Sequence, residues 1–252
     1  MNIKFLGTGT STGVPEIGCK CEVCTSPDIK NRRLRASVLV NVNSTRLLID
    51  CGPDFRQQIM HEEFSPLHGV LLTHEHYDHV GGIDDLRPFC KFDDVDIYST
   101  NITLDALRMR MPYSFREHKY PGVPSFRLHE VQPDKPFSIN DIKIIPVKVM
   151  HHMLPILGFR IMGFAYLTDV KSIPEEEFSK LENLDVLVIN ALRIEEHMAH
   201  MNLEEALATI KKIAPERAYL IHMSHRIGLH EEVQKILPQN VYLSYDGLEI
   251  EV

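Results

Sequence analysis

The chain has 252 residues, of which 44% are hydrophobic and 25% are charged, proportions typical of folded globular proteins that exclude disordered and collagen-like classes. The length is compatible with one domain or two. A formal charge of -8, from 27 basic and 35 acidic residues, argues against tight sequence-independent binding to nucleic acid, which depends on clustered cations. We therefore expect no large nucleic acid among the partners of this protein.

Strand and helix patterns alternate along the chain. The sequence predicts a strand at residues 2–6 before a glycine-rich turn, and then strands at 36–42, 46–49 and 69–73, with a helical segment after Pro53. It then predicts a helix at 104–109, strands at 141–149 and 156–167, a helix at 174–181, a strand at 185–189, a helix at 203–213, a strand at 217–221, a helix at 231–237 and a strand at 241–243. Asn202 and Glu205 have the spacing of a capping box for the 203–213 helix. Because no repeat or long linker interrupts this pattern, we expect one domain over residues 1–252.

The composition also bears on location and on the use of cysteine. No run approaches about 18 consecutive apolar residues, so the sequence predicts no membrane span and no membrane partner. Glycines interrupt the first residues before an apolar signal core could form, and we expect a cytoplasmic protein. Of the five cysteines, three lie within residues 19–24, which indicates thiolate metal ligands rather than a disulfide framework.

The segment at residues 70–79 is rich in potential metal ligands. Its apolar strand runs directly into His74, His76, Asp78 and His79. In an extended backbone His74 and His76 project to the same side, and the other two follow on the next turn, so two metal ions can share this edge. Four potential ligands in six positions favour metal ligation over a solvated polar loop.

This spacing resembles the HxHxDH signature of the metallo-β-lactamase superfamily. The resemblance implies an α/β fold (α+β in some schemes), namely an αββα sandwich of two mixed sheets with helices on the outer faces. It also implies a dinuclear metal-dependent hydrolase.

The superfamily pattern further requires a later histidine, an aspartate and a last histidine, which correspond here to His151, Asp169 and His222. The resemblance then implies that one metal binds His74, His76 and His151, the other binds Asp78, His79 and His222, and Asp169 bridges them. His152 competes with His151; we favour His151 because the pattern places the ligand seven residues before the glycine of a Leu-Pro-x-Leu-Gly segment. Asp50 matches an aspartate that orients a metal-bound histidine.

A narrower resemblance, to PhnP-type phosphodiesterases, extends over nearly the whole chain. Cys19, Cys21 and Cys24 match a CxCxxC clip, here inserted near residues 18–25, and His225 matches the fourth ligand of its structural zinc. A Cys3His set suits a closed tetrahedral zinc site. The resemblance also implies manganese or zinc as the two catalytic metals, and it suggests a homodimer.

The same resemblance places a catalytic histidine at His200, three residues after His197, which we interpret as a surface histidine. We expect a metal-bridging hydroxide as nucleophile, with Asp78 in the catalytic set and His200 as general acid near its ordinary pKa of about 6.5. Candidates to hold a substrate phosphate are Arg56, Arg87 and Arg193.

The expected activity is hydrolysis of small, cyclic phosphodiesters such as phosphoribosyl cyclic phosphate or cyclic nucleotides. One alternative is a tRNA 3'-end endonuclease, although the chain lacks a Gly/Pro/Lys-rich arm that would bind tRNA. Another is a thioester or lactone hydrolase on the same metals. An alternative of a different class is a metal-binding scaffold without catalytic activity.

Overall fold

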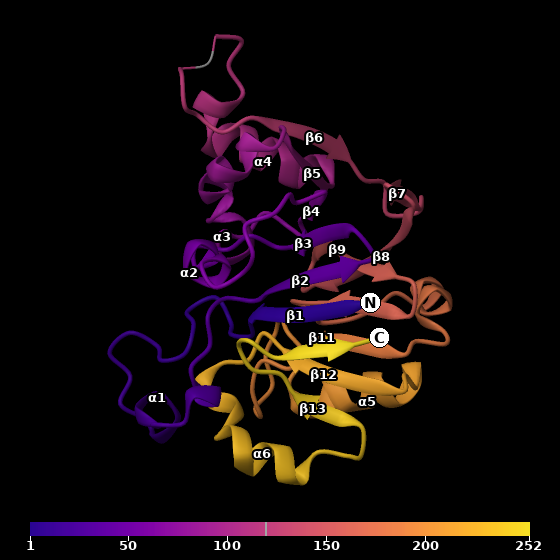
Figure 1. Cartoon of the computed structure of the whole chain (residues 1–252). Helices are drawn as coiled ribbons and strands as arrows, with labels where there is room; N and C mark the ends of the chain where they lie inside the picture. Colours follow the sequence, from indigo (N-terminus) through magenta and orange to yellow (C-terminus); the bar gives the residue numbers. More distant parts are fainter. Residues whose placement is uncertain (119) are drawn as a thin grey trace.

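The structure is a computed structural model, and it describes residues 1–118 and 120–252. Over these residues, two seven-stranded sheets pack against each other, as Figure 1 shows. The first sheet has the order β14 (Glu249–Glu251), β1 (Asn2–Gly7), β2 (Ser37–Val42), β3 (Thr45–Ile49), β4 (Gly69–Leu71), β5 (Val95–Ser99) and β6 (Phe126–Glu130). The second has the order β13 (Val241–Leu243), β12 (Arg217–Ile221), β11 (Val186–Asn190), β10 (Phe164–Leu167), β9 (Leu154–Ile161), β8 (Ile142–His151) and β7 (Phe137–Ile139).

Both sheets are mixed. In the first, β3 to β6 run parallel while β14, β1, β2 and β3 alternate in direction. In the second, β10 to β13 run parallel while β7 to β10 alternate. Parallel neighbours end at the same edge of a sheet, so the loops after several strands gather there.

Helices cover the outer faces of the two sheets. The described α-helices are α1 (Glu22–Thr25), α2 (Phe55–Ile59), α3 (Tyr77–Val80), α4 (Asn101–Arg110), α5 (Leu203–Ile213) and α6 (His230–Ile236). The described 3-10 helices are η1 (Ile29–Asn31), η2 (Ile83–Lys91), η3 (Pro112–Ser114), η4 (Glu175–Leu181) and η5 (His225–Ile227). One apolar cluster joins α2, η2 and α4 to the first sheet, and another joins η4, α5 and α6 to the second.

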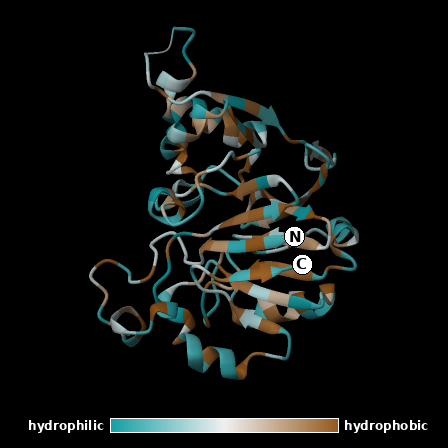
Figure 2. Ribbon diagram, viewed as in Figure 1, coloured by the Kyte–Doolittle hydropathy of each residue, from teal (hydrophilic) through white to brown (hydrophobic). Residues whose placement is uncertain are grey.

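The main core lies between the sheets. Alternate residues of the strands face inward and are fully buried, among them Phe5, Val38, Phe159 and Tyr166. Figure 2 shows this concentration of hydrophobic residues along the central strands, with many hydrophilic residues on the outer helices. The expected αββα sandwich is therefore confirmed.

Most predicted elements are present, and two differ in kind. The run at 156–167 is not one strand but the hairpin β9–β10, because the chain turns at Met162, where φ is 54°, and Gly163. The segment predicted as a helix at 174–181 is the 3-10 helix η4, which has no side-chain hydrogen bond at its N-terminal cap. The capping box of Asn202 and Glu205 forms at the start of α5 as predicted. Within the described residues, no helix is long and apolar enough to cross a membrane.

Candidate metal centres

A cluster of histidines and carboxylates lies where several strands end. Asp50 follows β3, His74 follows β4, His151 ends β8, Asp169 follows β10 and His222 follows β12. Figure 1 places this edge on the left, beside α2 and α3. The two sheets thus hold these side chains on a rigid frame, as a preorganised site requires.

The backbone is strained at three of these positions. Asp50, Asp169 and His222 adopt φ angles of 61°, 59° and 57°, in the left-handed region that residues other than glycine seldom occupy. Such strain persists only where the surrounding structure enforces it, and it is concentrated at functional sites. Here it turns the chain sharply after a strand, which keeps each polar side chain at the sheet edge.

One half of the cluster contains Asp78, His79, Asp169 and His222, whose potential ligand atoms all lie within 4.8 Å of one another. Nε2 of His79 is 3.2 Å from Oδ2 of Asp78 and 3.1 Å from Oδ2 of Asp169. Nε2 of His222 is 3.3 Å from Asp78 and 3.2 Å from Oδ1 of Asp169. Asp169 therefore meets both histidines, one with each oxygen.

The other half brings three imidazoles together. The ring centroid of His76 is 4.5 Å from that of His74 and 5.2 Å from that of His151, and the His74–His151 separation is 5.7 Å. His151 is buried, whereas His152 is exposed. The structure thus places His151, rather than His152, with the two earlier histidines.

Hydrogen bonds at the far ring nitrogens determine which nitrogen faces the cluster. Nδ1 of His151 lies 2.9 Å from the carbonyl oxygens of Asp169 and Ala199, and because both are acceptors Nδ1 must carry the proton. Nδ1 of His79 donates to Asp50 over 2.7 Å. In each ring Nε2 is then a lone-pair donor, the form that binds a metal.

Asp50 supports a second histidine through a residue that the sequence analysis does not identify. Its carboxylate accepts hydrogen bonds from the backbone N–H and the hydroxyl of Thr73, and that hydroxyl is also 3.0 Å from Nδ1 of His74. Asp50 thus orients His79 directly and His74 by way of Thr73. In the sequence, a threonine before the motif cannot be distinguished from an ordinary strand residue. Only the contacts of Thr73 in the folded structure reveal this role.

The donor set fits divalent metal ions. Nε2 of His74 is buried and has no hydrogen-bond partner, a costly condition for a polar atom unless a cation meets it. Burial opposes ionisation of Asp169, yet the imidazoles of His222 and His79 hold its pKa well below its usual value. Nitrogen and oxygen lone pairs therefore converge on buried points where a positive charge is favourable.

His200 lies against both halves of the cluster. Its ring is 4.5 Å from that of His151 and is stacked on that of His222 at 5.0 Å, and its Nδ1 is 3.6 Å from Asp169. His151, Asp169 and His200 also form a group that could hold a metal. Burial lowers the pKa of His200 to about 3, so the near-neutral pKa expected from the sequence is wrong for the protein without metals. The ring centroid of His197 is 5.1 Å from that of His200, and His197 is partly exposed.

A second cluster joins residues 19–24 to η5. The sulfurs of Cys19 and Cys21 are each 3.2 Å from Nδ1 of His225, and that of Cys24 is 3.4 Å away. Tetrahedral zinc with ordinary bond lengths separates sulfur from nitrogen by about 3.6 Å. The four residues thus fit one closed metal site.

Local contacts prepare this clip for a metal. The backbone N–H of Cys24 donates to the sulfur of Cys21 and lowers the pKa of that thiol to about 6, which favours the thiolate. Nε2 of His225 is 3.4 Å from Glu16, a partner that the sequence analysis does not identify. Such carboxylates orient ligating imidazoles.

None of the three arginines suggested by the sequence contacts the histidine cluster. Arg87 pairs with Asp84, Arg193 donates to carbonyls of its own loop, and Arg56 lines a separate cavity between α2 and η2. The contacts given for these three side chains therefore lie outside the histidine cluster.

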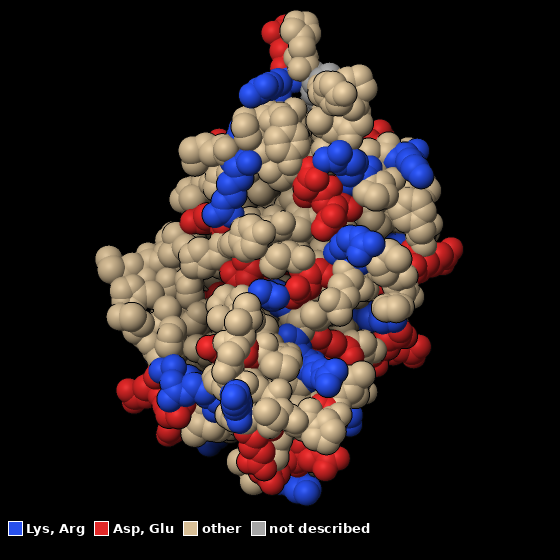
Figure 3. Space-filling model, turned by 90° about the vertical axis from the view of Figure 1, so that its left-hand side faces the viewer, with Lys and Arg blue, Asp and Glu red and all other residues tan. Residues whose placement is uncertain are grey.

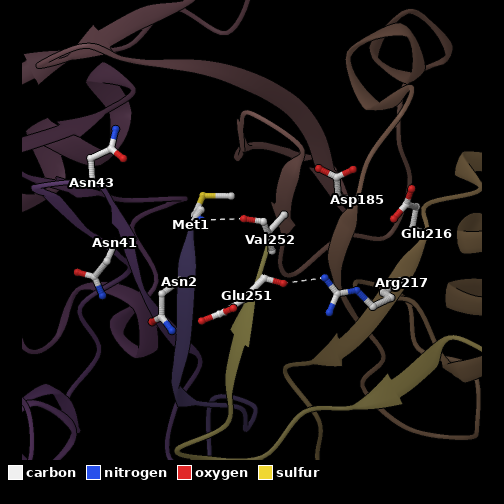
Figure 4. A pocket seen from close by; sticks show the side chains of 9 residues that line it. All are labelled: Met1, Asn2, Asn41, Asn43, Asp185, Glu216, Arg217, Glu251 and Val252. Atoms are coloured by element: carbon white, nitrogen blue, oxygen red, sulfur yellow. Dashed lines mark hydrogen bonds between the residues drawn. The ribbon is translucent and has the colours of Figure 1, made fainter.

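A cavity of about 640 Å³ lies at the opposite ends of the strands, between the two chain termini, as Figure 4 shows. Asn2 and Arg217, which line it, begin β1 and β12, whereas His222 follows the end of β12, roughly 17 Å away along an extended strand. Arg217 donates to the carbonyl of Glu251. The lining contains no histidine or cysteine, so this cavity lacks the chemistry of the two clusters.

Comparison with known proteins shows the family of this chain. A family model described as the beta-lactamase superfamily domain matches residues 45–223. An octanoyltransferase from Porphyromonas gingivalis is 47% identical over 251 residues, covering 99% of this chain and 51% of that protein, so the chain spans about half the length of this relative.

Two solved structures are similar over the whole chain. A diphosphatase from the PhnP family is 36% identical, with a TM-score of 0.92 over 100% of this chain and 97% of that one. Zn²⁺-bound PqqB from Methylobacterium extorquens shares the fold, with a TM-score of 0.83 and 18% identity over 100% of both chains.

Proposed function

Since this chain belongs to the metallo-β-lactamase superfamily and, within it, to the PhnP family, we propose that it is a metal-dependent hydrolase of small phosphodiesters. The observation that supports this most is the buried Asp169, which lies in one potential metal-binding group with His79 and His222 and in another with His151. A carboxylate between two groups of imidazoles is the arrangement that a dinuclear hydrolase needs.

The proposed metals are two catalytic divalent ions, manganese or zinc, and one structural zinc. The first catalytic ion would be held by His74, His76 and His151, and the second by Asp78, His79 and His222. Asp169 would contact both ions. The structural zinc would be held by Cys19, Cys21, Cys24 and His225. When bound, the catalytic pair supplies a nucleophilic hydroxide and compensates the negative charge of the phosphoryl group.

The protein's own contribution is position and proton control. Asp50 fixes the His79 ring, and the carbonyls of Asp169 and Ala199 fix the His151 ring. His200 lies within reach of the same center and would hold the proton that the leaving alkoxide needs. It can take up that proton when the anionic substrate lies beside it, because a nearby negative charge favours the imidazolium.

A small substrate agrees with the surface around the site. Figure 3, which views the molecule from the side of α1, α2 and α3, shows Lys and Arg interspersed with Asp and Glu rather than one continuous basic field. Such a field is the usual footprint of a protein that binds a large RNA. We therefore favour small diesters over tRNA.

The test compares hydrolysis of bis(p-nitrophenyl) phosphate and p-nitrophenyl phosphate by wild type and His200→Ala, each loaded with manganese or zinc. We expect turnover of the diester with weak turnover of the monoester, and a loss of about 100-fold or more in His200→Ala. Metal content separates two roles: a proton donor leaves it unchanged, whereas a ligand lowers it. Absence of diester turnover by fully loaded wild type would falsify the proposal.

The octanoyltransferase relative favours one second candidate, a thioester hydrolase. Because this chain covers 51% of that relative, the transferase activity in the name of that protein can reside in either half. Hydrolysis of an octanoyl thioester by the metal-loaded protein, with no diester turnover, would select this candidate.

A further inference from the structure

The last residue of α4 lies beside the histidine cluster. Arg110 donates a hydrogen bond from Nη1 to the backbone carbonyl of Glu75, the peptide between His74 and His76. His76 is exposed while His74 is buried, so this carbonyl lies at the outer side of the cluster. The guanidinium is therefore held beside the loop that carries His74 and His76.

The charge of Arg110 is not neutralised by a neighbour. Across residues 1–118 and 120–252, no carboxylate lies within 4.0 Å of its guanidinium, whereas Arg108 in the same helix pairs with Asp105 at 2.6 Å and Arg87 pairs with Asp84 at 2.8 Å. A guanidinium has five N–H donors, and one of them meets Glu75. No carboxylate among the described residues occupies the remaining donors, so they are available to an anion.

We infer that Arg110 is a positioning residue that binds an anionic group of the substrate other than the phosphodiester held by the metals. This inference rests on the proposed function and narrows it to small phosphodiesters that carry a second anionic group, either a phosphate or a carboxylate. The planar fork of arginine suits such a group because it donates two parallel hydrogen bonds to it.

A purely structural role makes a different prediction. If Arg110 only tied α4 to the loop at Glu75, its loss would alter every substrate equally. A contact with a second anionic group instead changes the preference between two substrates that differ only in that group, and it changes KM more than kcat because the contact is remote from the reacting bond.

The experiment uses thymidine 5'-(p-nitrophenyl phosphate) with and without a 3'-phosphate. We expect metal-loaded wild type to prefer the 3'-phosphorylated diester by about tenfold or more in kcat/KM, the effect of one charge-assisted contact. Arg110→Ala loses this preference through KM, Arg110→Lys keeps part of it because it keeps the charge, and Arg108→Ala retains it as a matched surface control.

The inference is overturned if wild type turns over both diesters without a preference, or if Arg110→Ala retains the preference. If wild type hydrolyses neither diester, the proposed function fails, and equilibrium binding of thymidine 3',5'-bisphosphate then tests Arg110 by itself. Binding weaker by about tenfold in Arg110→Ala than in Arg108→Ala supports the contact; equal binding by the two variants overturns it.

Discussion

The two metal-binding clusters are built in different ways. The histidine and carboxylate cluster takes its side chains from the ends of strands in both sheets and from the start of α3, and most of them are buried. The Cys3His clip takes three of its four from residues 19–24, and Cys21 is exposed. The core therefore positions the first cluster, while the second depends on a short local segment.

Apolar packing shows the same difference. The core between the sheets includes Phe5, Phe159 and Tyr166, whereas the apolar cluster at the clip consists of Val14, Val23 and Cys24 with partly buried neighbours. So small a cluster contributes little burial. We expect the histidine cluster to keep its shape without metal and the clip to order only when its metal binds.

Among the variants that compare the two clusters, we expect Asp50→Asn to have the largest effect on metal affinity or activity. It removes the charge that orients His79 and, through Thr73, His74. Loss of such an outer partner lowers metal affinity or activity by about 10- to 100-fold. Metal content per chain and kcat/KM measure the effect.

The clip provides the control for Asp50→Asn, since it should keep its one metal ion per chain. If the catalytic metals and kcat/KM were both unchanged, the histidine cluster would not depend on Asp50, and the preorganisation argued above would be wrong.

Cys21→Ser breaks the clip and has a smaller expected effect on catalysis. The variant loses the thiolate that the Cys24 N–H stabilises, so one metal ion per chain is lost and proteases cleave residues 19–25 more readily. We expect kcat/KM to fall by less than about tenfold, because Cys21 does not orient a ligand of the catalytic metals. Limited proteolysis and kcat/KM of Cys21→Ser and wild type measure the two effects. A larger loss of activity would mean that the clip also supports His222.

How far the sequence predicted the fold depends on the strength of the local apolar or capping signal in each element. The capping box of Asn202 and the apolar runs of β2 and β3 carry enough local signal to predict α5 and both strands. Strands β5, β6, β7 and β14 are absent from the predictions, because polar residues interrupt their short sequences VDIYS, FRLHE, FSI and EIE. Sheet pairing supplies what their local sequence lacks.

The residues of the site likewise divide into those that the sequence predicted and those that it did not. Residues 74–79 are recognisable because the ligands are adjacent in sequence, and the structure brings His151, Asp169 and His222 to them as expected. Thr73, Glu16 and Arg110 are not recognisable, since each acts through a contact with a residue or peptide that only folding brings near. The low pKa of His200 likewise results from burial, which a motif does not show.

A buried polar network lies beside the residue that follows His222 and belongs to neither cluster. Thr8 accepts a backbone hydrogen bond from Met223, the residue after His222, and its hydroxyl donates to Asp246 at 2.7 Å. The buried Arg33 donates to the same hydroxyl. Burial raises the pKa of Asp246 to about 6.

The smallest expected effect is on stability and comes from Asp246. Because its folded pKa lies above the unfolded value of 3.8, the folded state binds the proton more tightly, and this stabilising contribution is lost as pH rises through about 6. The free energy of unfolding of wild type, relative to Asp246→Asn, should therefore fall by about 1 kcal/mol between pH 5 and 7.5. Urea unfolding at both pH values measures it, and because both proteins carry the same metal clusters, pH effects on metal binding cancel in the difference. Parallel stability curves for the two proteins would show that Asp246 is solvated, contrary to its burial in this network.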